Sequence, residues 1–242
     1  MAELWDLYDA EGHLTGETML RGEKVPNGRY HRVVEAIFLN SRGEILLQKR
    51  ALRKKLYPNI LWYPTGGAVL AGETVEQACI REVQEELGFV PDMENARLLH
   101  HRVEQSFIRD VFLIFQDMDV KNMRFQEGEV DDARWLFPED IPDQPEAWQA
   151  FSFMPHLKEC RPFLQLESMR RRIPCGLYRH YKGNMYRVEG LCLHSETVEP
   201  MVIYRALYGT REMWVRPASM WNEEVTVDGR SVRRFQKIED SI

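Results

Sequence analysis

The segment from Gly66 to Phe89 constrains the fold of this chain more than any other, because it combines a glycine turn, a capped helix and a run of carboxylates. Thr74 and Gln77 have the Thr-x-x-Gln spacing of a capping box, and Gly88 stands where a helix-terminating glycine is expected. The glycines follow an apolar run at 61–64. The segment therefore predicts a strand, a loop and a helix in that order.

Three carboxylates share one face of this predicted helix, because Glu82, Glu85 and Glu86 stand at i, i+3 and i+4. A neighbouring apolar stripe can pack on a core, and it consists of Cys79, Ile80, Val83 and Leu87. Like charges at this spacing destabilise a helix by a few tenths of a kcal/mol per pair. Clustered carboxylate oxygens are the ligands that Mg²⁺ or Mn²⁺ prefers, and these ions usually share their ligands with substrate phosphates. The face therefore predicts a divalent metal site that can share its ions with a substrate phosphate.

The same stretch resembles the Nudix box at every fixed position, namely Gly67, Glu73, Arg81-Glu82, Val83, Glu85-Glu86 and Gly88-Phe89. The resemblance implies an α/β fold, an α/β/α sandwich around a mixed sheet, and hydrolysis of a pyrophosphate bond. It also implies that Glu82, Glu85 and Glu86 hold the metals, that the Gly67 carbonyl adds a ligand, and that Arg81 pairs with Glu73. The competing interpretation is a solvated acidic helix with an Arg81–Glu85 pair.

A basic run from Lys49 to Lys55 precedes the strand that leads into the box, and its cations are candidates for holding substrate phosphates. With His31-Arg32 and Leu61-Trp62, this run is similar to the isopentenyl diphosphate isomerase-like branch of the superfamily, which favours Arg50 and Lys54 as substrate-binding residues. A solvated surface loop is the alternative.

The isomerase pattern fails where that enzyme needs a catalytic Cys and a metal-binding His, since this chain has Thr65-Gly66-Gly67-Ala68 there. Isomerisation is therefore disfavoured. Cys79 lies on the apolar stripe and is expected to be a buried, unreactive thiol, and His31 is expected to be structural.

Several strands are expected around the box. Residues 3–30 predict a short hairpin or an edge strand. Residues 31–39 and 44–49 predict a second hairpin, and 96–99 and 109–115 predict two further strands. His100-His101 is expected on the surface. Glu127 or Glu129 is a candidate general base, against the alternative of an ordinary loop carboxylate.

A helix interrupted at Pro155 and Pro162 is expected from 147 to 172. Its apolar residues are expected to dock on the preceding domain, and they are Trp148, Phe151, Phe153, Leu157, Phe163 and Leu166. The joint at 170–174 then sets the predicted domains at 1–171 and 172–242.

Residues 172–242 show short alternating runs with hairpin turns at Lys182-Gly-Asn184 and Asp228-Gly229, which predicts a small all-β barrel or compact sandwich. The segment resembles a family of small bacterial domains of unknown function. Its polar and amphipathic residues are candidates for a binding face, against the alternative of ordinary β surface. They are Arg179, His180, Tyr181, Lys182, His194, Glu196, Tyr204 and Arg216.

Charge and composition exclude some classes of partner. The net charge is −6, and residues 1–171 carry 21 Lys and Arg against 29 Asp and Glu, whereas residues 172–242 carry 11 against 9. An acidic chain disfavours nucleic acid and membrane surfaces as partners. No Cys-x-x-Cys pair, basic leader or apolar run of membrane length is present, so reduced thiols and a cytoplasmic location are expected. A homodimer stays open.

The leading functional hypothesis is a Mg²⁺- or Mn²⁺-dependent hydrolase that cleaves the pyrophosphate bond of a nucleoside diphosphate linked to another group. A nucleotide-binding regulator without turnover is the alternative from a different class, and the isomerase is the third. The box does not identify the substrate.

Overall fold

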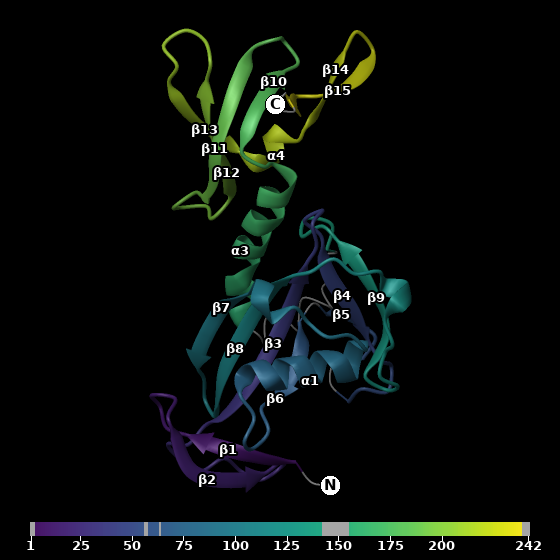
Figure 1. Cartoon of the computed structure of the whole chain (residues 1–242), viewed down its shortest axis with the longest axis vertical. Coiled ribbons are helices and arrows are strands. Elements are labelled where there is room, and N and C mark those ends of the chain that lie inside the picture. The colour runs from purple at the N-terminus through teal and green to yellow at the C-terminus, as the bar shows by residue number, and fades with distance from the viewer. Residues whose placement is uncertain (1–2, 56–57, 63, 142–154, 239–242) are drawn as a thin grey trace. The chain divides into compact units, whose positions relative to one another are not determined.

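The computed structural model describes residues 3–55, 58–62, 64–141 and 155–238, and it divides the chain into one compact unit that ends at Cys160 and another that begins at Arg161 (Figure 1). The division falls inside helix α3 (Pro155–Arg172), whose last residue lies beside the predicted boundary at 171/172.

The first unit begins with an antiparallel hairpin of β1 (Leu4–Tyr8) and β2 (Leu14–Leu20), as predicted. The turn between them ends at Gly12, whose φ of 82° lies in the left-handed region that favours glycine.

A seven-stranded sheet forms the centre of the first unit, with the order β5-β4-β3-β8-β7, while β6 pairs with β3 and β9 pairs with β4. Its strands are β3 (His31–Leu39), β4 (Ile45–Arg50), β5 (Leu61–Trp62), β6 (Thr65–Ala68), β7 (Ala96–Val103), β8 (Phe107–Phe115) and β9 (Val130–Leu136). Strands β3 and β8 are parallel and the other pairs are antiparallel, so the sheet is mixed. Two short 3₁₀ turns complete the unit, at Met93–Asn95 and Val120–Asn122.

The two strands of the second predicted hairpin separate directly after the turn that joins them. Strands β3 and β4 are adjacent, but their register contains only Leu39 opposite Ile45. Further along, β3 pairs with β6 from Val33 to Ala36, and β4 pairs with β5 and β9. The glycines of β6 are thereby placed at the middle of the sheet.

Layers cover both faces of this sheet, which confirms the α/β/α sandwich. Val34 and Phe38 on β3 pack in the core with Val83 and Leu87 of α1 (Val75–Leu87). Glu35, which points to the opposite face because side chains alternate along a strand, hydrogen-bonds through Oε2 to His156 Nε2 of α3 at 2.9 Å.

Helix α3 differs from the prediction in two ways. It runs without a break from Pro155 through Pro162, although Pro162 lacks the N–H that would bond the preceding turn, and the predicted helical residues 147–154 lie outside the described residues. Leu166 packs in the core of the second unit rather than on the first, and Phe163 is 46% exposed. The predicted contacts of Trp148, Phe151 and Phe153 and of the Leu157 side chain lie outside the described residues.

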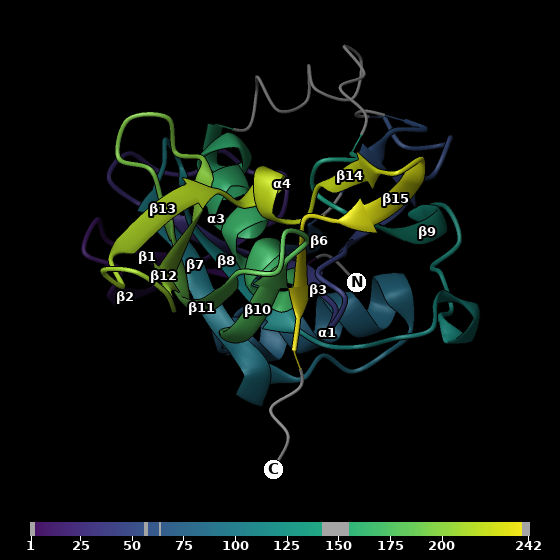
Figure 2. The same cartoon turned by 90° about the horizontal axis from the view of Figure 1, so that it is seen from above.

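In the second unit, five antiparallel strands form a sheet of order β13-β12-β11-β10-β16, and β13 and β16 are its two edges (Figure 2). The strands are β10 (Gly176–His180), β11 (Met185–Leu193), β12 (Pro200–Ala206), β13 (Met213–Pro217) and β16 (Phe235–Lys237). Helix α4 (Ala218–Trp221) and a separate hairpin of β14 (Glu224–Val227) and β15 (Arg230–Arg233) complete it. The all-β prediction and both hairpin turns are confirmed. Among the described residues the sheet does not close into a barrel, because the two edge strands do not pair.

The core of the second unit is aromatic. Trp221 is fully buried and stacks on Phe235 with ring centroids 3.9 Å apart, and Tyr178 meets Trp221 edge to face. This unit therefore has a core of its own, which Leu166 of helix α3 and Ile173, the residue directly after that helix, complete. Across the described residues of both units, no helix combines the length and the apolar character that crossing a membrane requires.

Candidate active site

The predicted carboxylate face is carried by α1, whose start is fixed by the predicted capping box. The Thr74 hydroxyl accepts from Gln77 N at 3.2 Å, and the Gln77 side chain accepts from Thr74 N at 2.9 Å. The helix ends at Gly88 in the left-handed conformation, with φ 75°. These caps satisfy backbone groups at both ends and set the rotation at which the glutamates face the sheet.

The two glycines of β6 allow close approaches that a larger residue would block. A Cβ on Gly66 would stand 2.0 Å from the Val34 carbonyl oxygen of β3, and a Cβ on Gly67 would stand 2.4 Å from Glu82 Oε1. The β6 backbone therefore packs against β3 at Gly66 and against the Glu82 carboxylate at Gly67.

Arg81 braces the loop against the helix, as the resemblance implied. Its Nε and Nη2 donate to Glu73 at 2.7 and 3.0 Å, and Nη2 also donates to the Ala68 carbonyl at 2.9 Å. The Nη1 group donates to Glu82 Oε1 at 2.8 Å and lies 3.5 Å from Glu85 Oε2. Hydrogen bonding to the Arg81 guanidinium lowers the pKa of Glu73. One guanidinium thus connects the loop to two of the three predicted metal ligands.

Glu82 and Glu86 are buried enough for their ionisation to be perturbed. Burial raises the pKa of Glu82, although the adjacent Arg81 opposes the shift. Burial and the neighbouring Glu82 raise the pKa of Glu86 to about 7. Glu85 lies further out, with 53% of its side chain exposed. Two partly buried carboxyls whose charged forms are disfavoured give a site that gains free energy from a cation.

Gln48 is a site residue that the sequence reasoning did not single out. It is 4% exposed, and its Nε2 donates to the Pro64 carbonyl at 2.9 Å and to Glu86 Oε2 at 3.4 Å. Its Oε1 is buried and has no hydrogen-bond partner among the residues that the structure describes. A polar residue in the buried run of β4 was the available signal, since buried polar groups normally have a partner.

The predicted substrate-binding residues and one candidate base come together beside Glu86. Lys54 Nζ forms an ion pair with a Glu129 carboxylate oxygen. The Ala51 amide donates to the Glu129 carbonyl at 2.9 Å, which joins the basic run to the segment before β9. Burial lowers the pKa of Arg50, while Glu86 and Glu129 attract its charge. Carboxylates and cations far apart in sequence therefore share one region.

The donor set fits a hard divalent cation. Glu82, Glu85 and Glu86 offer carboxylate oxygens, and the unpartnered Gln48 oxygen is available beside them. Arg81 presently takes one oxygen of Glu82 and lies near one of Glu85. Among the described residues, no three His, Cys, Asp or Glu side chains already converge at metal-ligand spacing. Small rotations of side chains on one helix face are needed to gather the oxygens.

Other predicted candidates lie elsewhere. The Glu127 side chain is 95% exposed and lies 3.9 Å from Arg53, which leaves Glu129 as the loop carboxylate near Glu86. His31 stacks on Trp5 with centroids 4.4 Å apart, and burial lowers its pKa. Cys79 is buried, as predicted, and burial raises its pKa to about 12.

The surface prediction for the adjacent histidines holds for only one of them. The His100 side chain is 12% exposed and its ring lies 5.9 Å from that of His156. His101 is half exposed and its Nδ1 lies 2.6 Å from Asp110 Oδ1. Both residues belong to β7, so alternation along the strand turns one side chain inward and the other outward.

The candidate binding face of the second unit is only partly assembled. Arg179, His180 and Tyr181 line one groove, and Lys182 Nζ lies 5.6 Å from the Tyr181 ring. The remaining candidates do not line this groove. Tyr204 is buried in the core, and Arg216 lies over the Phe235 ring. His194 Nδ1 accepts hydrogen bonds from two backbone amides, and Glu196 is exposed.

The family model described as "NUDIX domain" matches residues 29–157, which is more than half of the chain and includes the whole carboxylate helix. The chain belongs to the Nudix family. An uncharacterized Nudix hydrolase of Listeria monocytogenes is 38% identical over 140 residues, covering 57% of this chain and 82% of the relative. A Nudix hydrolase of Deinococcus radiodurans is 30% identical over 140 residues, covering 57% and 81%. The chain is accordingly a Nudix-type hydrolase.

The second unit matches another family, described as a protein of unknown function (DUF1653), over residues 176–237. A DUF1653 protein of known structure from Bordetella bronchiseptica is 37% identical and covers 27% of this chain and 87% of its own, with a TM-score of 0.26. The solved Deinococcus radiodurans protein DR0079 is 30% identical and covers 57% and 85%, with a TM-score of 0.46. The predicted combination of a Nudix domain with a domain of unknown function is confirmed.

Proposed function

We propose that this Nudix-type hydrolase cleaves the pyrophosphate bond of a nucleoside diphosphate linked to another group, with Mg²⁺ or Mn²⁺ as cofactor. The observation that carries the proposal is the placement of Glu86, a partly buried carboxyl whose pKa is raised by burial and by its neighbour Glu82, beside the cations of Arg50 and Lys54. Carboxylates on one side and cations on the other suit a metal-bound polyphosphate.

Glu82, Glu85 and Glu86 are the proposed metal ligands, with the Gly67 carbonyl as a further ligand. A divalent cation held there supplies charge neutralisation at phosphate oxygens and lowers the pKa of a bound water. Gln48 orients Glu86 through its hydrogen bond at 3.4 Å and is itself held by the Pro64 carbonyl.

Arg81 and Glu73 position the site without touching substrate. The Arg81 guanidinium holds Glu82 on one side and Glu73 on the other, and Glu73 in turn accepts from the Leu70 amide at 3.0 Å. This chain of contacts fixes the loop that follows strand β6, the strand that carries Gly67. A loose loop would let the carboxylates and the substrate shift relative to each other, which is costly for catalysis.

Lys54 and Arg50 are the proposed phosphate contacts, and Glu129 is the proposed general base. Lys54 forms an ion pair with Glu129. When a substrate phosphate takes over the Lys54 ammonium, the Glu129 carboxylate loses its partner and becomes free to accept a proton from water. The ion pair thus keeps the base neutralised until the substrate arrives.

The test is a substrate screen in isotopically labelled water, read by mass spectrometry. Nucleoside diphosphate sugars, dinucleotides, nucleoside triphosphates and prenyl diphosphates are each incubated with Mg²⁺, with Mn²⁺ or with EDTA, and Glu82→Gln is the matched control. We expect metal-dependent cleavage that places one labelled oxygen on a phosphate product and that Glu82→Gln abolishes. Tight nucleotide binding without any cleavage would instead support a regulator, and isomerised prenyl product would support the isomerase.

A further inference from the structure

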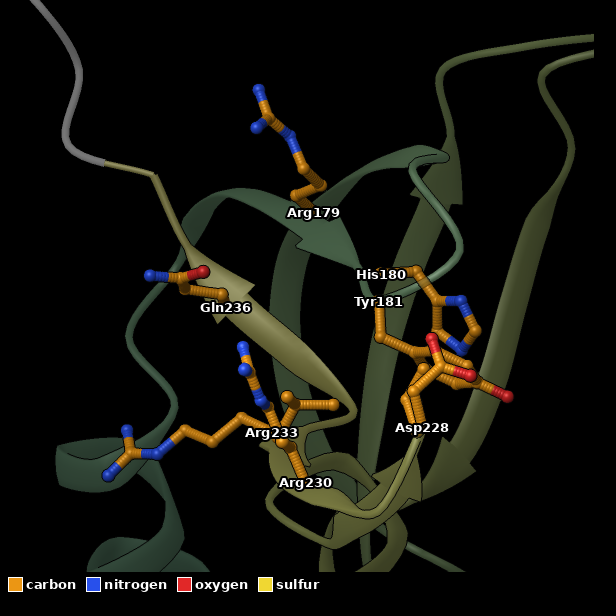
Figure 3. Close-up of a pocket in the computed structure, with 9 residues that line it drawn as sticks. Arg179, His180, Tyr181, Asp228, Arg230, Arg233 and Gln236 are labelled. Atoms are coloured by element: carbon orange, nitrogen blue, oxygen red, sulfur yellow. The ribbon is translucent and has the colours of Figure 1, made fainter.

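The second unit contains a groove of about 930 Å³ between the hairpin β14–β15 and the neighbouring strands β10 and β16. Figure 3 shows Arg230, Arg233 and Gln236 on one side of this groove and Tyr181 and Asp228 on the other. All of these residues belong to the DUF1653 match, for which the comparisons assign no activity. The volume is in the range of sites that hold small ligands or a segment of a larger one.

The groove carries three arginines whose charges are not neutralised. In the part of the chain that the structure describes, Arg179, Arg230 and Arg233 form no salt bridge, and each is exposed. Neighbouring arginines of the same unit behave differently, since Arg234 pairs with Glu223 at 2.8 Å and Arg205 lies 3.5 Å from Glu189. Guanidinium groups left with free donors in a concave surface favour a phosphate ligand, which they can bind bidentately.

The opposite side of the groove suits a base and a sugar. Tyr181 is exposed, its ring lies 4.4 Å from that of His180, and the Lys182 ammonium lies over it at 5.6 Å. An exposed aromatic ring in a basic groove is the usual platform for base stacking. The Asp228 carboxylate lies at the tip of the hairpin, where it can accept hydrogen bonds from ribose hydroxyls or a base amino group.

We infer that this groove is a nucleotide-binding site, in which Arg230 and Arg233 bind phosphate and Tyr181 stacks on the base. The ligand class is a phosphorylated nucleoside, present either as a free mononucleotide or as part of a single strand. The site is separate from the carboxylate helix and uses no residue of the first unit. It gives the appended unit a binding function of its own, beyond hydrolysis.

The charge distribution agrees with this assignment. The chain as a whole has a net charge of −6, but Lys and Arg outnumber Asp and Glu by 11 to 9 in residues 172–242. Net negative charge therefore disfavours nucleic-acid partners for residues 1–171 but not for residues 172–242.

The experiment uses the full chain in EDTA, so that hydrolysis at the carboxylate helix does not consume the probe. Adenosine monophosphate is titrated by calorimetry, and a fluorescent single-stranded oligonucleotide of eight nucleotides is titrated by anisotropy. The variants are Arg230→Ala/Arg233→Ala and Tyr181→Ala. The matched control is Arg187→Ala, which removes one exposed arginine of β11 that does not line the groove. Hydrolysis at saturating substrate is measured in parallel and is expected to be unchanged in all of them.

We expect both groove variants to weaken binding of at least one probe by about tenfold or more, and the control to leave it unchanged. Weakening for both probes assigns a mononucleotide site, and weakening for the oligonucleotide alone assigns a strand-binding site. A steeper salt dependence for the wild type than for Arg230→Ala/Arg233→Ala is also expected. The inference is overturned when neither probe binds at millimolar concentration, when Arg187→Ala loses as much affinity as the groove variants, or when Tyr181→Ala and Arg230→Ala/Arg233→Ala bind as well as the wild type.

Discussion

Replacing Glu86 by Gln should stabilise the metal-free protein while it removes activity. The pKa of Glu86 is raised from 4.5 to about 7, first by burial and then by Glu82. The unfolded chain loses this proton near pH 4.5, whereas the folded protein holds it to about pH 7, so the free energy of unfolding falls as pH rises through that window. At about 1.4 kcal/mol per unit of pKa, the full effect is about 3 kcal/mol above pH 7. Gln has nearly the same shape, can still accept from Gln48, and avoids this cost.

The assay is the melting temperature of wild type and Glu86→Gln in EDTA between pH 5 and pH 8. For a unit of this size about 3 kcal/mol corresponds to a rise of up to roughly 10 °C, and the difference should shrink toward zero as pH approaches 4.5. Glu85→Gln is the matched control, because this neighbour is more than half exposed and its replacement should shift the melting temperature little at any pH. A Glu86→Gln protein that melts at or below the wild-type temperature at pH 8 would refute the reasoning.

Three further predictions concern the loop, the brace and the second unit. Gly67→Ala should fold but lose about 100-fold in kcat, since the atoms nearest to its Cβ belong to the Glu82 side chain, at 2.4 Å. Gly66→Ala, whose Cβ would stand 2.0 Å from the Val34 backbone oxygen, should fail to fold, and equal melting temperatures for the two variants would argue against this. Arg81→Lys should lower the free energy of unfolding by about 2 kcal/mol, because Lys cannot reproduce the bidentate contact with Glu73. An unchanged midpoint of chemical denaturation would contradict this prediction. A chain of residues 1–172 should keep the kcat of the full chain on an unselective substrate; loss of kcat in a folded truncation would assign the second unit to the active site.

Local signals predicted the carboxylate helix completely. The capping box at Thr74, the terminal Gly88 and the glutamate spacing are all contained in one segment, and each is determined by interactions within a few residues. The hairpin turns of the second unit were equally readable, because Asp228-Gly229 adopts the positive φ values, 49° and 76°, that such a turn requires.

Features that depend on distant contacts were not predictable from one sequence. Gln48 reaches Glu86 across 38 positions, and Lys54 reaches Glu129 across 75, so nothing local indicates that these side chains meet. Whether the second sheet closes was not readable for a related reason, since local alternation indicates strands but not whether the edges β13 and β16 pair. Arg230, Arg233 and Gln236 were missed because their groove exists only once the hairpin lies beside β10 and β16.

The most direct test of the central claim is manganese binding and turnover measured on the same samples. Wild type and Glu82→Gln are freed of metal, titrated with Mn²⁺ by electron paramagnetic resonance, and assayed at each metal concentration on the best substrate of the screen. We predict that wild-type activity rises in step with bound Mn²⁺, and that Glu82→Gln binds the ion more weakly and turns over about 100- to 1,000-fold more slowly. Full wild-type activity without metal, or a folded Glu82→Gln protein within about tenfold of wild type, would contradict the claim.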